Sequence, residues 1–392
     1  MRHGRRSSLL LALAPLLGAA LFAGALAPPP ARADASDDAL FAQLVGRVAA
    51  QFDSTHGGFA EKGAPSSPAV TLALAIARDR SDALWQSRAT QTILWTWTLF
   101  DSVGGGYFDQ SESTRHDRGT FEKRTIPNAE RFENLMDAWR TVGDTDYRRR
   151  AAKVADFFDR VLLDARGGFV DGQVGDRDLV PESNGLAIHA WLMWAATTGD
   201  PRVRDFALRS LDRAWTVSWT EDIGMLHRDT FGDIQKAPQL MDQVEMGRAY
   251  VLAAHLGGRA GDLERAKAIG DRLRSNFEDM EKGGWRTQAV LDRKKTKIKN
   301  AARVFDENAR AARFLCELAS VTGDNAYRDA ARRGIRAFAD DFAKADLEAA
   351  DWALAVRALD HPELPERPEW KLPESTPTQP RVIQITTPRR KK

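Results

Sequence analysis

Apolar residues recur at helical spacing along most of the chain and predict pairs of helices with different surroundings. The clearest pair lies between residues 304 and 342. Its first half, residues 311–321, is apolar on almost every side, which predicts an inner helix covered on both faces. In its second half, apolar residues recur at steps of three and four and charged residues fill the other side of the helix. This pattern predicts an outer helix with one buried face, formed by Tyr327, Ala331, Ile335, Phe338 and Phe342.

Glycine-centred turns divide the chain into repeats of this pair. A helix can end on Gly in the left-handed conformation, and Asp can cap the next helix. Such turns are predicted at Val142-Gly143-Asp144, Thr198-Gly199-Asp200, Ala260-Gly261-Asp262 and Thr322-Gly323-Asp324. Their glycines are 56, 62 and 62 residues apart, as in a repeated helical unit. A second kind of turn precedes the predicted inner helices, at Gly105-Gly106-Tyr107, Gly167-Gly168-Phe169, Gly283-Gly284-Trp285 and a degenerate Gly224-Met225.

The repeats predict a closed ring. Inner helices are expected over residues 68–77, 128–141, 183–197, 240–256 and 304–321. Outer helices are expected over residues 82–99, 144–163, 200–215, 262–277 and 324–342. The helices expected over residues 37–50 and 347–359 have no partner adjacent in sequence. If these two helices pair with each other, the ring closes, and the apolar sides that an open array would expose at its two ends are covered. The predicted fold is an all-α (α/α)6 toroid of six helical hairpins, with short β-hairpin loops on one face.

Both ends of the chain differ in composition from the repeats. Residues 1–33 combine a basic start, an apolar run from Leu9 to Ala27 and the small residues Ala31-Arg32-Ala33, which predicts a cleaved signal peptide. We therefore expect a secreted or periplasmic protein, with an uncleaved amino-terminal membrane anchor as the alternative. The toroid is expected to occupy residues 34–360. Residues 361–392 are rich in Pro and end in a basic stretch, which predicts an extended, disordered tail.

Charge and cysteine content exclude several classes of protein. Without residues 1–33 the chain has 53 basic and 55 acidic residues, too balanced for a general nucleic-acid binder. Its one cysteine, Cys316, excludes an internal disulfide and a multi-cysteine metal site. The Gly-Lys-Ser phosphate loop, the His-Glu-x-x-His metal motif and the Gly-x-Ser-x-Gly nucleophile motif are absent, and we predict neither a cofactor nor a metal.

Polar residues at the starts of the predicted inner helices are the candidate site, because a closed ring would gather them round one opening. The catalytic candidates are Glu182, Asp242 and Asp306. The substrate-binding candidates are Asn128, Glu130, Asn184, His189, Gln243, Glu245, Glu307, Asn308, Tyr107 and Trp285. Carboxylates, amides and flat rings suit a carbohydrate, whose hydroxyls bind polar groups and whose C–H faces lie on aromatic rings.

Two chemistries and one structural explanation fit these residues. Glycoside hydrolysis needs one carboxylic acid and one carboxylate across the scissile bond. His189 could instead act as the base of a sugar epimerase, or be a hydrogen-bonded core histidine. Asp, Asn, Ser and Glu also favour the first turn of any helix, where they cap free amides and oppose the helix dipole.

Short motifs between residues 52 and 342 resemble a known family. They are Gly104-Gly105-Gly106-Tyr107-Phe108-Asp109, Lys123-Arg124-Thr125-Ile126-Pro127-Asn128, and Val142-Gly143-Asp144 with Tyr147. This pattern is similar to the helical part of the bacterial and spermatogenesis-associated thioredoxin-domain family, and Val180-Pro181-Glu182-Ser183-Asn184 echoes its helix start. The family's Ser-Gly-Asn-Ser core is replaced here, by Asn128-Ala129-Glu130 in one repeat and by Glu182-Ser183-Asn184 in another. The resemblance implies a six-hairpin glycosidase-like fold. The family's thioredoxin domain and Cys pair are not present in this sequence, and the resemblance implies neither redox activity nor a catalytic residue.

The sequence leads to two functional hypotheses. The first is an exported toroid that binds or processes a carbohydrate or another small polar ligand in a central acidic cavity. If it is an enzyme, it is a glycoside hydrolase or resembles a sugar epimerase. The second is a non-catalytic envelope scaffold whose toroid and proline-rich tail bind a protein partner. No contact with nucleic acid is expected, and contact with a membrane is expected only through an uncleaved signal segment.

Overall fold

The computed structural model describes residues 35–56, 58–61, 63–109, 122–173, 179–227, 238–257, 259–289 and 302–368. The predicted signal peptide and residues 369–392 of the predicted tail lie outside these ranges. Within them, no helix is both long enough and apolar enough to span a membrane.

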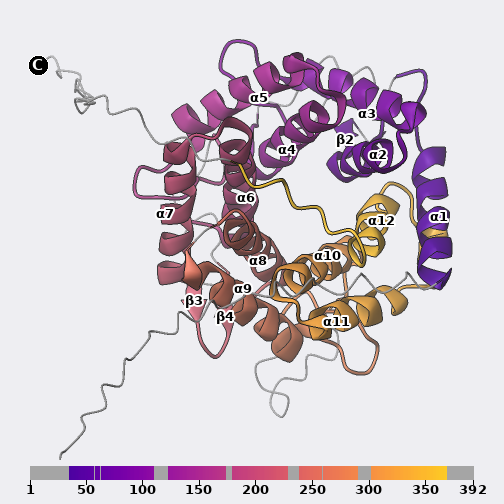
Figure 1. Ribbon diagram of the computed structural model, residues 1–392, viewed down its shortest axis with the longest axis vertical. Helices are drawn as coiled ribbons and strands as arrows, with labels where there is room; N and C mark the ends of the chain where they lie inside the picture. The colour runs from indigo at the N-terminus through magenta and orange to yellow at the C-terminus, as the bar shows by residue number, and fades with distance from the viewer. Residues whose placement is uncertain are drawn as a thin grey trace, which may run out of the picture. The chain divides into compact units, whose positions relative to one another are not determined.

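Six inner helices surround the centre of a ring, and six outer helices cover them in the described part of the chain (Figure 1). The inner helices are α2 (Ser67–Arg80), α4 (Thr125–Val142), α6 (Pro181–Thr198), α8 (Leu240–His255), α10 (Phe305–Thr322) and α12 (Ala349–Ala358). The outer helices are α1 (Ala35–Ala50), α3 (Ala83–Thr96), α5 (Thr145–Phe157), α7 (Pro201–Ser218), α9 (Ala260–Arg272) and α11 (Asn325–Arg336). Each inner helix packs on the next, and α12 packs on both α1 and α2. The predicted (α/α)6 toroid is confirmed.

Three of the four predicted helix-to-helix turns have the expected chemistry. Gly143, Gly199 and Gly323 end their helices with φ values of 79°, 66° and 72°, a region that few other residues tolerate. The aspartate after each glycine caps the next helix, as Asp144 does by accepting the backbone N–H of Asp146. In the first hairpin, Ser81 adopts the left-handed conformation instead of Gly.

The turn predicted at Gly261 is wrong. Helix α8 ends at His255, Gly257 takes the left-handed conformation, and Gly261 lies inside α9. Asp262 occupies the third position of α9, where its side chain accepts the backbone N–H of Arg259 at 2.9 Å. The carboxylate thus still caps the helix, but from inside its first turn.

Short turns and hairpins connect the outer helices to the inner ones. Several outer helices are shorter than predicted because a tighter or wider helical turn follows them, at Trp97–Leu99, Phe158–Leu162, Leu273–Phe277 and Phe342–Lys344. Antiparallel hairpins pair β1 (Ala60–Glu61) with β2 (Ala64–Pro65) and β3 (Trp219–Thr220) with β4 (Gly224–Met225), and the second contains the predicted turn at Gly224-Met225. Single bridges close the other Gly-aromatic turns, pairing Phe100 with Tyr107, Leu163 with Phe169, and Glu278 with Trp285.

The tail prediction needs a correction at its start. Residues 361–368 have no regular secondary structure, as expected of a proline-rich segment, but they pack on the ring. Glu363 forms ion pairs with Arg78 of α2 and Arg357 of α12, and only 8% of its side chain is exposed. These ion pairs hold residues 361–368 on the ring, although the composition of this segment alone suggests disorder.

Inner helices α6 and α8 approach each other closely at Gly185. A Cβ atom added there would lie 2.4 Å from the carbonyl carbon of Glu245 and 2.5 Å from the amide nitrogen of Met246. Both are backbone atoms, so neither can rotate away as a side chain could. The absence of a side chain at Gly185 therefore sets the spacing between two helices that carry candidate site residues.

Gly185→Ala is expected to lower the free energy of unfolding by about 3 kcal/mol, since the helices must separate to admit the methyl group. Gly46→Ala is the matched control, because Gly46 lies in α1 with no atom within 4 Å of its added Cβ. That substitution should raise stability by up to about 1 kcal/mol through helix propensity. Urea unfolding followed by circular dichroism measures both. Equal effects of the two substitutions would contradict the close approach at Gly185.

Candidate functional site

Four of the predicted ligand-binding amides instead hold the Gly-aromatic turns. Asn128, Asn184, Gln243 and Asn308 are fully buried. Asn308 accepts the backbone N–H of Trp285 at 2.6 Å and donates to the carbonyls of Trp285 and Val304 at 2.9 and 2.8 Å. The other three amides make the equivalent bonds to Tyr107, Phe169 and Met225. These amides are not available to a substrate.

The predicted aromatic platforms are also core residues. Tyr107 is 1% exposed, and Trp285 is fully buried against Gly334 of α11. Each ring belongs to a turn that one of the buried amides holds. The site that we propose below includes neither the amides nor these two rings.

Asn308→Ala is expected to cost about 2–3 kcal/mol of stability, because it leaves the N–H and the carbonyl of Trp285 buried without their partner. Asn325→Ala is the control, since Asn325 is an exposed residue in the first turn of α11. It should change stability by less than about 0.5 kcal/mol. Thermal unfolding of the two variants tests this, and a similar melting temperature for both would show that the amide does not hold the turn.

A small charged cavity lies at the centre of the ring. All six inner helices contribute to its wall, which contains Ser67, Pro68, Thr71, Glu130, Glu133, Leu186, Arg248, Arg310, Arg313 and Asp351. Its volume is about 40 Å³. A buried water needs roughly 10–15 Å³ measured in this way, so the cavity has room for a few waters and not for a sugar ring.

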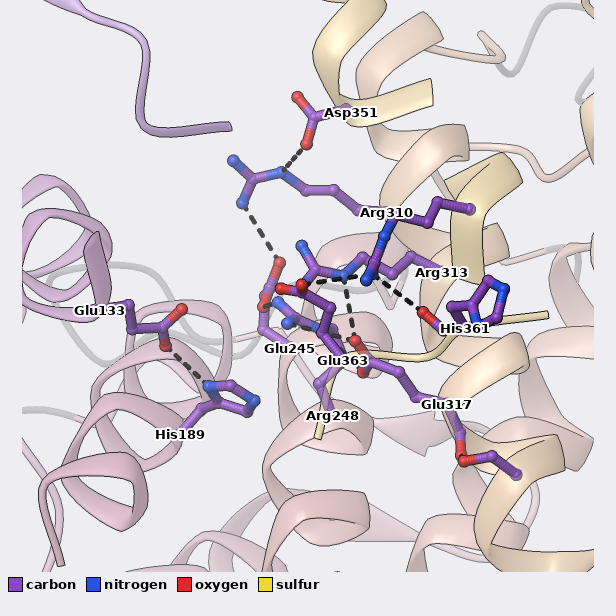
Figure 2. Close-up of polar contacts among 12 residues, drawn as sticks. Glu133, His189, Glu245, Arg248, Arg310, Arg313, Glu317, Asp351, His361 and Glu363 are labelled. Carbon is purple, nitrogen blue, oxygen red and sulfur yellow. Dashed lines mark hydrogen bonds and ion pairs between the residues drawn. The ribbon is translucent and has the colours of Figure 1, made fainter. Parts of the chain in front are cut away.

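Arg310 of α10 joins three other inner helices across this cavity (Figure 2). Its guanidinium lies 2.6 Å from Glu130 of α4, 3.3 Å from Glu245 of α8 and 3.6 Å from Asp351 of α12. These carboxylates raise the pKa of Arg310 against the opposing effect of burial. Burial raises the pKa of Asp351 to about 6, which shows that the arginine only partly compensates this acid.

A second group of charges lies beside Arg310. Arg248 contacts Glu317 at 3.1 Å and Glu245 at 3.4 Å, and Arg313 contacts Glu317 at 3.0 Å. Burial would raise the pKa of Glu317, but the two arginines together lower it. The carboxylate of Glu317 is therefore held ionised in the core of the ring.

Glu133 of α4 and His189 of the neighbouring helix α6 point toward each other (Figure 2). A ring nitrogen of His189, Nδ1, lies 2.7 Å from the carboxylate of Glu133. Burial opposes ionisation of Glu133, but His189, Arg248 and Arg313 together lower its pKa. His189 is thus a buried histidine oriented by a carboxylate, an arrangement that serves both core packing and proton transfer.

An acidic group stands at the starts of α6, α8 and α10, which we call the acidic mouth: Glu182, Asp242, Glu245, Asp306 and Glu307. Asp242 is fully buried, accepts the backbone N–H of Glu182 at 3.1 Å and lies 2.8 Å from Nδ1 of His227. Burial raises the pKa of Asp242, while His227 opposes the shift. Two members are less buried, since Asp306 is exposed and Glu307 is half-buried.

Glu182 has the most perturbed environment in the acidic mouth. Burial raises its pKa to about 7, and the negative charges of Asp242 and Glu245 add to the shift. Among the described residues, no side chain donates a hydrogen bond to its carboxylate. Glu182 can therefore hold or release a proton near neutral pH, and it is mostly but not fully buried.

The structure brings some predicted residues together and leaves others apart. Glu130, Glu182, Asp242 and Glu245 belong to one connected electrostatic group around Arg310. Sequence analysis did not propose six of the charged participants as site residues: His227, Arg248, Arg310, Arg313, Glu317 and Asp351. A signal for some of them exists, because charges inside a helix predicted to be covered on both sides must have buried partners.

The described residues contain no group of three or more His, Cys, Asp or Glu side chains arranged to hold a metal ion. The charges in the ring pair with one another instead. What the site offers chemically is proton transfer and hydrogen bonding by carboxylates, arginines and a histidine.

Comparison with known proteins identifies the fold. No family model matches the chain, and no curated protein matches it. A D-mannose isomerase structure aligns with a TM-score of 0.68 at 14% identity, over 85% of this chain and 99% of that one. Cellobiose 2-epimerase from Spirochaeta thermophila gives 0.66 at 15%, over 83% and 96%. The GH76 α-mannanase BT2949 from Bacteroides thetaiotaomicron gives 0.64 at 10%, over 83% and 95%. The chain shares the six-hairpin glycosidase-like toroid of these proteins.

Proposed function

We propose that the chain binds a carbohydrate at the acidic mouth and processes it with Glu182 as the proton donor. The observation that carries this proposal is the environment of Glu182. Its pKa of about 7 leaves a large protonated fraction at neutral pH, and no described side chain occupies its carboxylate. A group of this kind at an opening suits general acid catalysis, since the best pKa for such a group lies near the working pH.

The neighbours of Glu182 supply the carboxylates that the reaction needs besides a proton donor. Acid-assisted cleavage of a glycosidic bond also needs a carboxylate that stabilises the positive charge developing on the sugar. Glu245 is ion-paired with both Arg248 and Arg310, and Asp242 interacts with His227. Asp306 and Glu307 add carboxylates at the rim, where sugar hydroxyls could donate hydrogen bonds to them.

The small volume of the central cavity favours the acidic mouth, and not the centre of the ring, as the binding site for a carbohydrate. About 40 Å³ cannot hold a sugar, and the arginines already occupy the centre. A carbohydrate would therefore bind above Arg310, against the first turns of α6, α8 and α10. In this position Glu182 contacts the substrate, while Arg310 stays behind the acids and fixes their positions.

The fold supports a carbohydrate as the substrate class. The names of the three similar structures refer to mannose isomerisation, cellobiose epimerisation and mannan hydrolysis. Membership of the helical part of the thioredoxin-domain family stays a prediction, and it would add no catalytic residue. Export through residues 1–33 is likewise part of the proposal, because those residues lie outside the described ranges.

A second reaction, isomerisation or epimerisation of a reducing sugar, is favoured by the Glu133–His189 pair. A histidine oriented by a carboxylate can remove a proton next to a carbonyl, and Arg248 lies close enough to lower the pKa of Glu133. This reaction requires the central cavity to widen enough to admit the open-chain sugar. We rank it second for that reason.

A panel of oligosaccharides and reducing monosaccharides, incubated with the protein and followed by product analysis, tests the proposal. We expect turnover or binding of at least one sugar, and its loss when Glu182, Asp242 and Asp306 are all replaced by the matching amides. New reducing ends would support hydrolysis, and a changed sugar at constant mass would support isomerisation. Binding and turnover unaffected by the triple replacement would remove the acidic mouth from the account.

The scaffold hypothesis makes a different prediction. If the tail binds a protein partner, removing residues 369–392 should abolish that binding. An enzyme of the kind proposed here should keep its activity, because the acidic mouth lies at the starts of the inner helices and the chain leaves the ring at their ends.

A further inference from the structure

Residues 361–368 form a strap across the face of the ring opposite the acidic mouth (Figure 1). Glu363 pairs with Arg78 near the end of α2 and with Arg357 near the end of α12. Further along, Nε2 of His255, the last residue of α8, donates to the carbonyl of Pro365 at 2.8 Å. Arg357 also donates to the carbonyl of His361 at 3.0 Å. The strap is therefore anchored to α2 and α12 near its start and to α8 further along, and these contacts fix its path.

A chamber of about 870 Å³ lies between the strap and the ends of α4 and α6. Its apolar wall includes Met136, Trp139, Met193 and Ala196, with Leu364 and Pro368 on the strap side. Four of its charged residues are paired with one another, Arg140 with Asp137 and Arg78 with Glu363. A volume of this size suits a bulky apolar group, and methionines adapt well to an aromatic ring.

The chain continues from the chamber itself. Pro368 is the last described residue, and it lines the chamber. Two residues later stands Trp370, followed by Leu372. Because the chain is continuous, a segment that begins at residue 369 starts within reach of the chamber. The next large aliphatic side chain, Val382, is ten residues beyond Leu372.

We propose that the chamber is a docking site for the chain's own segment 369–372, with Trp370 as the anchoring side chain. The strap delivers this residue to the chamber at a small entropic cost, since four contacts already fix the strap. An indole buries about 150–250 Å² and fills apolar space that would otherwise be open to water. This inference does not depend on the proposed function.

Four forms of the protein test whether Trp370 docks in the chamber: the unmodified protein, Trp370→Ala, a chain ending at Pro368 and a chain ending at Pro380. The last is the matched control, because it loses the basic end and Val382 but keeps Trp370. The probes are the fluorescence of 8-anilinonaphthalene-1-sulfonate, which reports open apolar sites, and hydrogen exchange of residues 361–368. Circular dichroism checks that all four forms are folded.

We expect Trp370→Ala and the chain ending at Pro368 to bind about one more dye molecule per chain and to exchange the strap amides at least tenfold faster. The chain ending at Pro380 should match the unmodified protein, and a peptide of residues 367–376 should displace the dye from the shortened chain. Trp370→Phe should behave as an intermediate, which keeps the test valid if the alanine variant does not fold.

Three results would overturn the proposal. Equal dye binding by the unmodified protein and Trp370→Ala would show that Trp370 does not fill the chamber. Strap exchange unchanged by the loss of Trp370 would show that the side chain does not secure the strap. A dimer of the unmodified protein that becomes a monomer in Trp370→Ala would place the indole in a second copy instead.

Discussion

Glu182→Gln is expected to lower turnover by about 10²–10⁴-fold on any substrate whose reaction needs a proton from the protein. The amide keeps the shape of the side chain but cannot donate the proton that leaves with the departing oxygen. Binding should change much less than turnover, because glutamine still hydrogen-bonds sugar hydroxyls. Steady-state kinetics on the best sugar of the panel separate the two effects, since kcat should fall and KM should stay similar.

The same residue sets the pH dependence of the reaction. Its pKa is raised to about 7, and the protonated form is the active one. We therefore expect kcat/KM to fall about tenfold per pH unit above pH 7. Glu264→Gln is the control, because Glu264 is an exposed carboxylate on α9 that pairs only with Lys267 among the described residues. A kcat of Glu182→Gln close to that of the control would exclude Glu182 as the proton donor.

Arg310→Met is expected to lower the free energy of unfolding by about 3–5 kcal/mol at pH 8, the usual effect of removing one partner from a buried ion pair. Methionine fills similar space but leaves Glu130, Glu245 and Asp351 without their shared cation. The penalty should shrink as the pH falls, because carboxylates without a counter-ion take up protons and become neutral. Guanidinium unfolding at several pH values measures this dependence.

Arg149→Met is the matched control for Arg310→Met. Arg149 pairs with Asp146 on the outside of α5, and 75% of its side chain is exposed. Its loss should change stability by less than about 0.5 kcal/mol at every pH. If Arg310→Met cost no more than this control, Arg310 would not be the residue that joins the inner helices.

The architecture could be predicted largely from local chemistry. Gly143, Gly199 and Gly323 adopt the left-handed conformation that ends a helix, and the aspartate after each of them caps the next helix. Gly261 misled the prediction because a Gly-Asp pair also fits the first turn of a helix, where Asp262 caps Arg259. The spacing of the turns then implied six hairpins without any knowledge of contacts between them.

The site could be predicted only in part, because residue type does not reveal orientation. Asn308 and Glu307 are adjacent in sequence, yet the amide is buried against Trp285 and the acid stands at the mouth. Side chains on one helix turn about 100° per residue, so neighbours serve different roles. Arg310 escaped prediction for a related reason, since its partners come from residues 130, 245 and 351, which only the closed ring brings together.

The central claim is that the acidic mouth keeps the carboxyl group of Glu182 protonated to near-neutral pH. Carbon-13 NMR of the side-chain carboxyl groups in glutamate-labelled protein, recorded from pH 4 to pH 9 beside Glu182→Gln, measures this most directly. The account predicts one carboxyl resonance that titrates with a midpoint near 7 and is missing from the variant. If the resonance lost in the variant titrates near the ordinary value of about 4.3 for glutamate, the account of this site is contradicted.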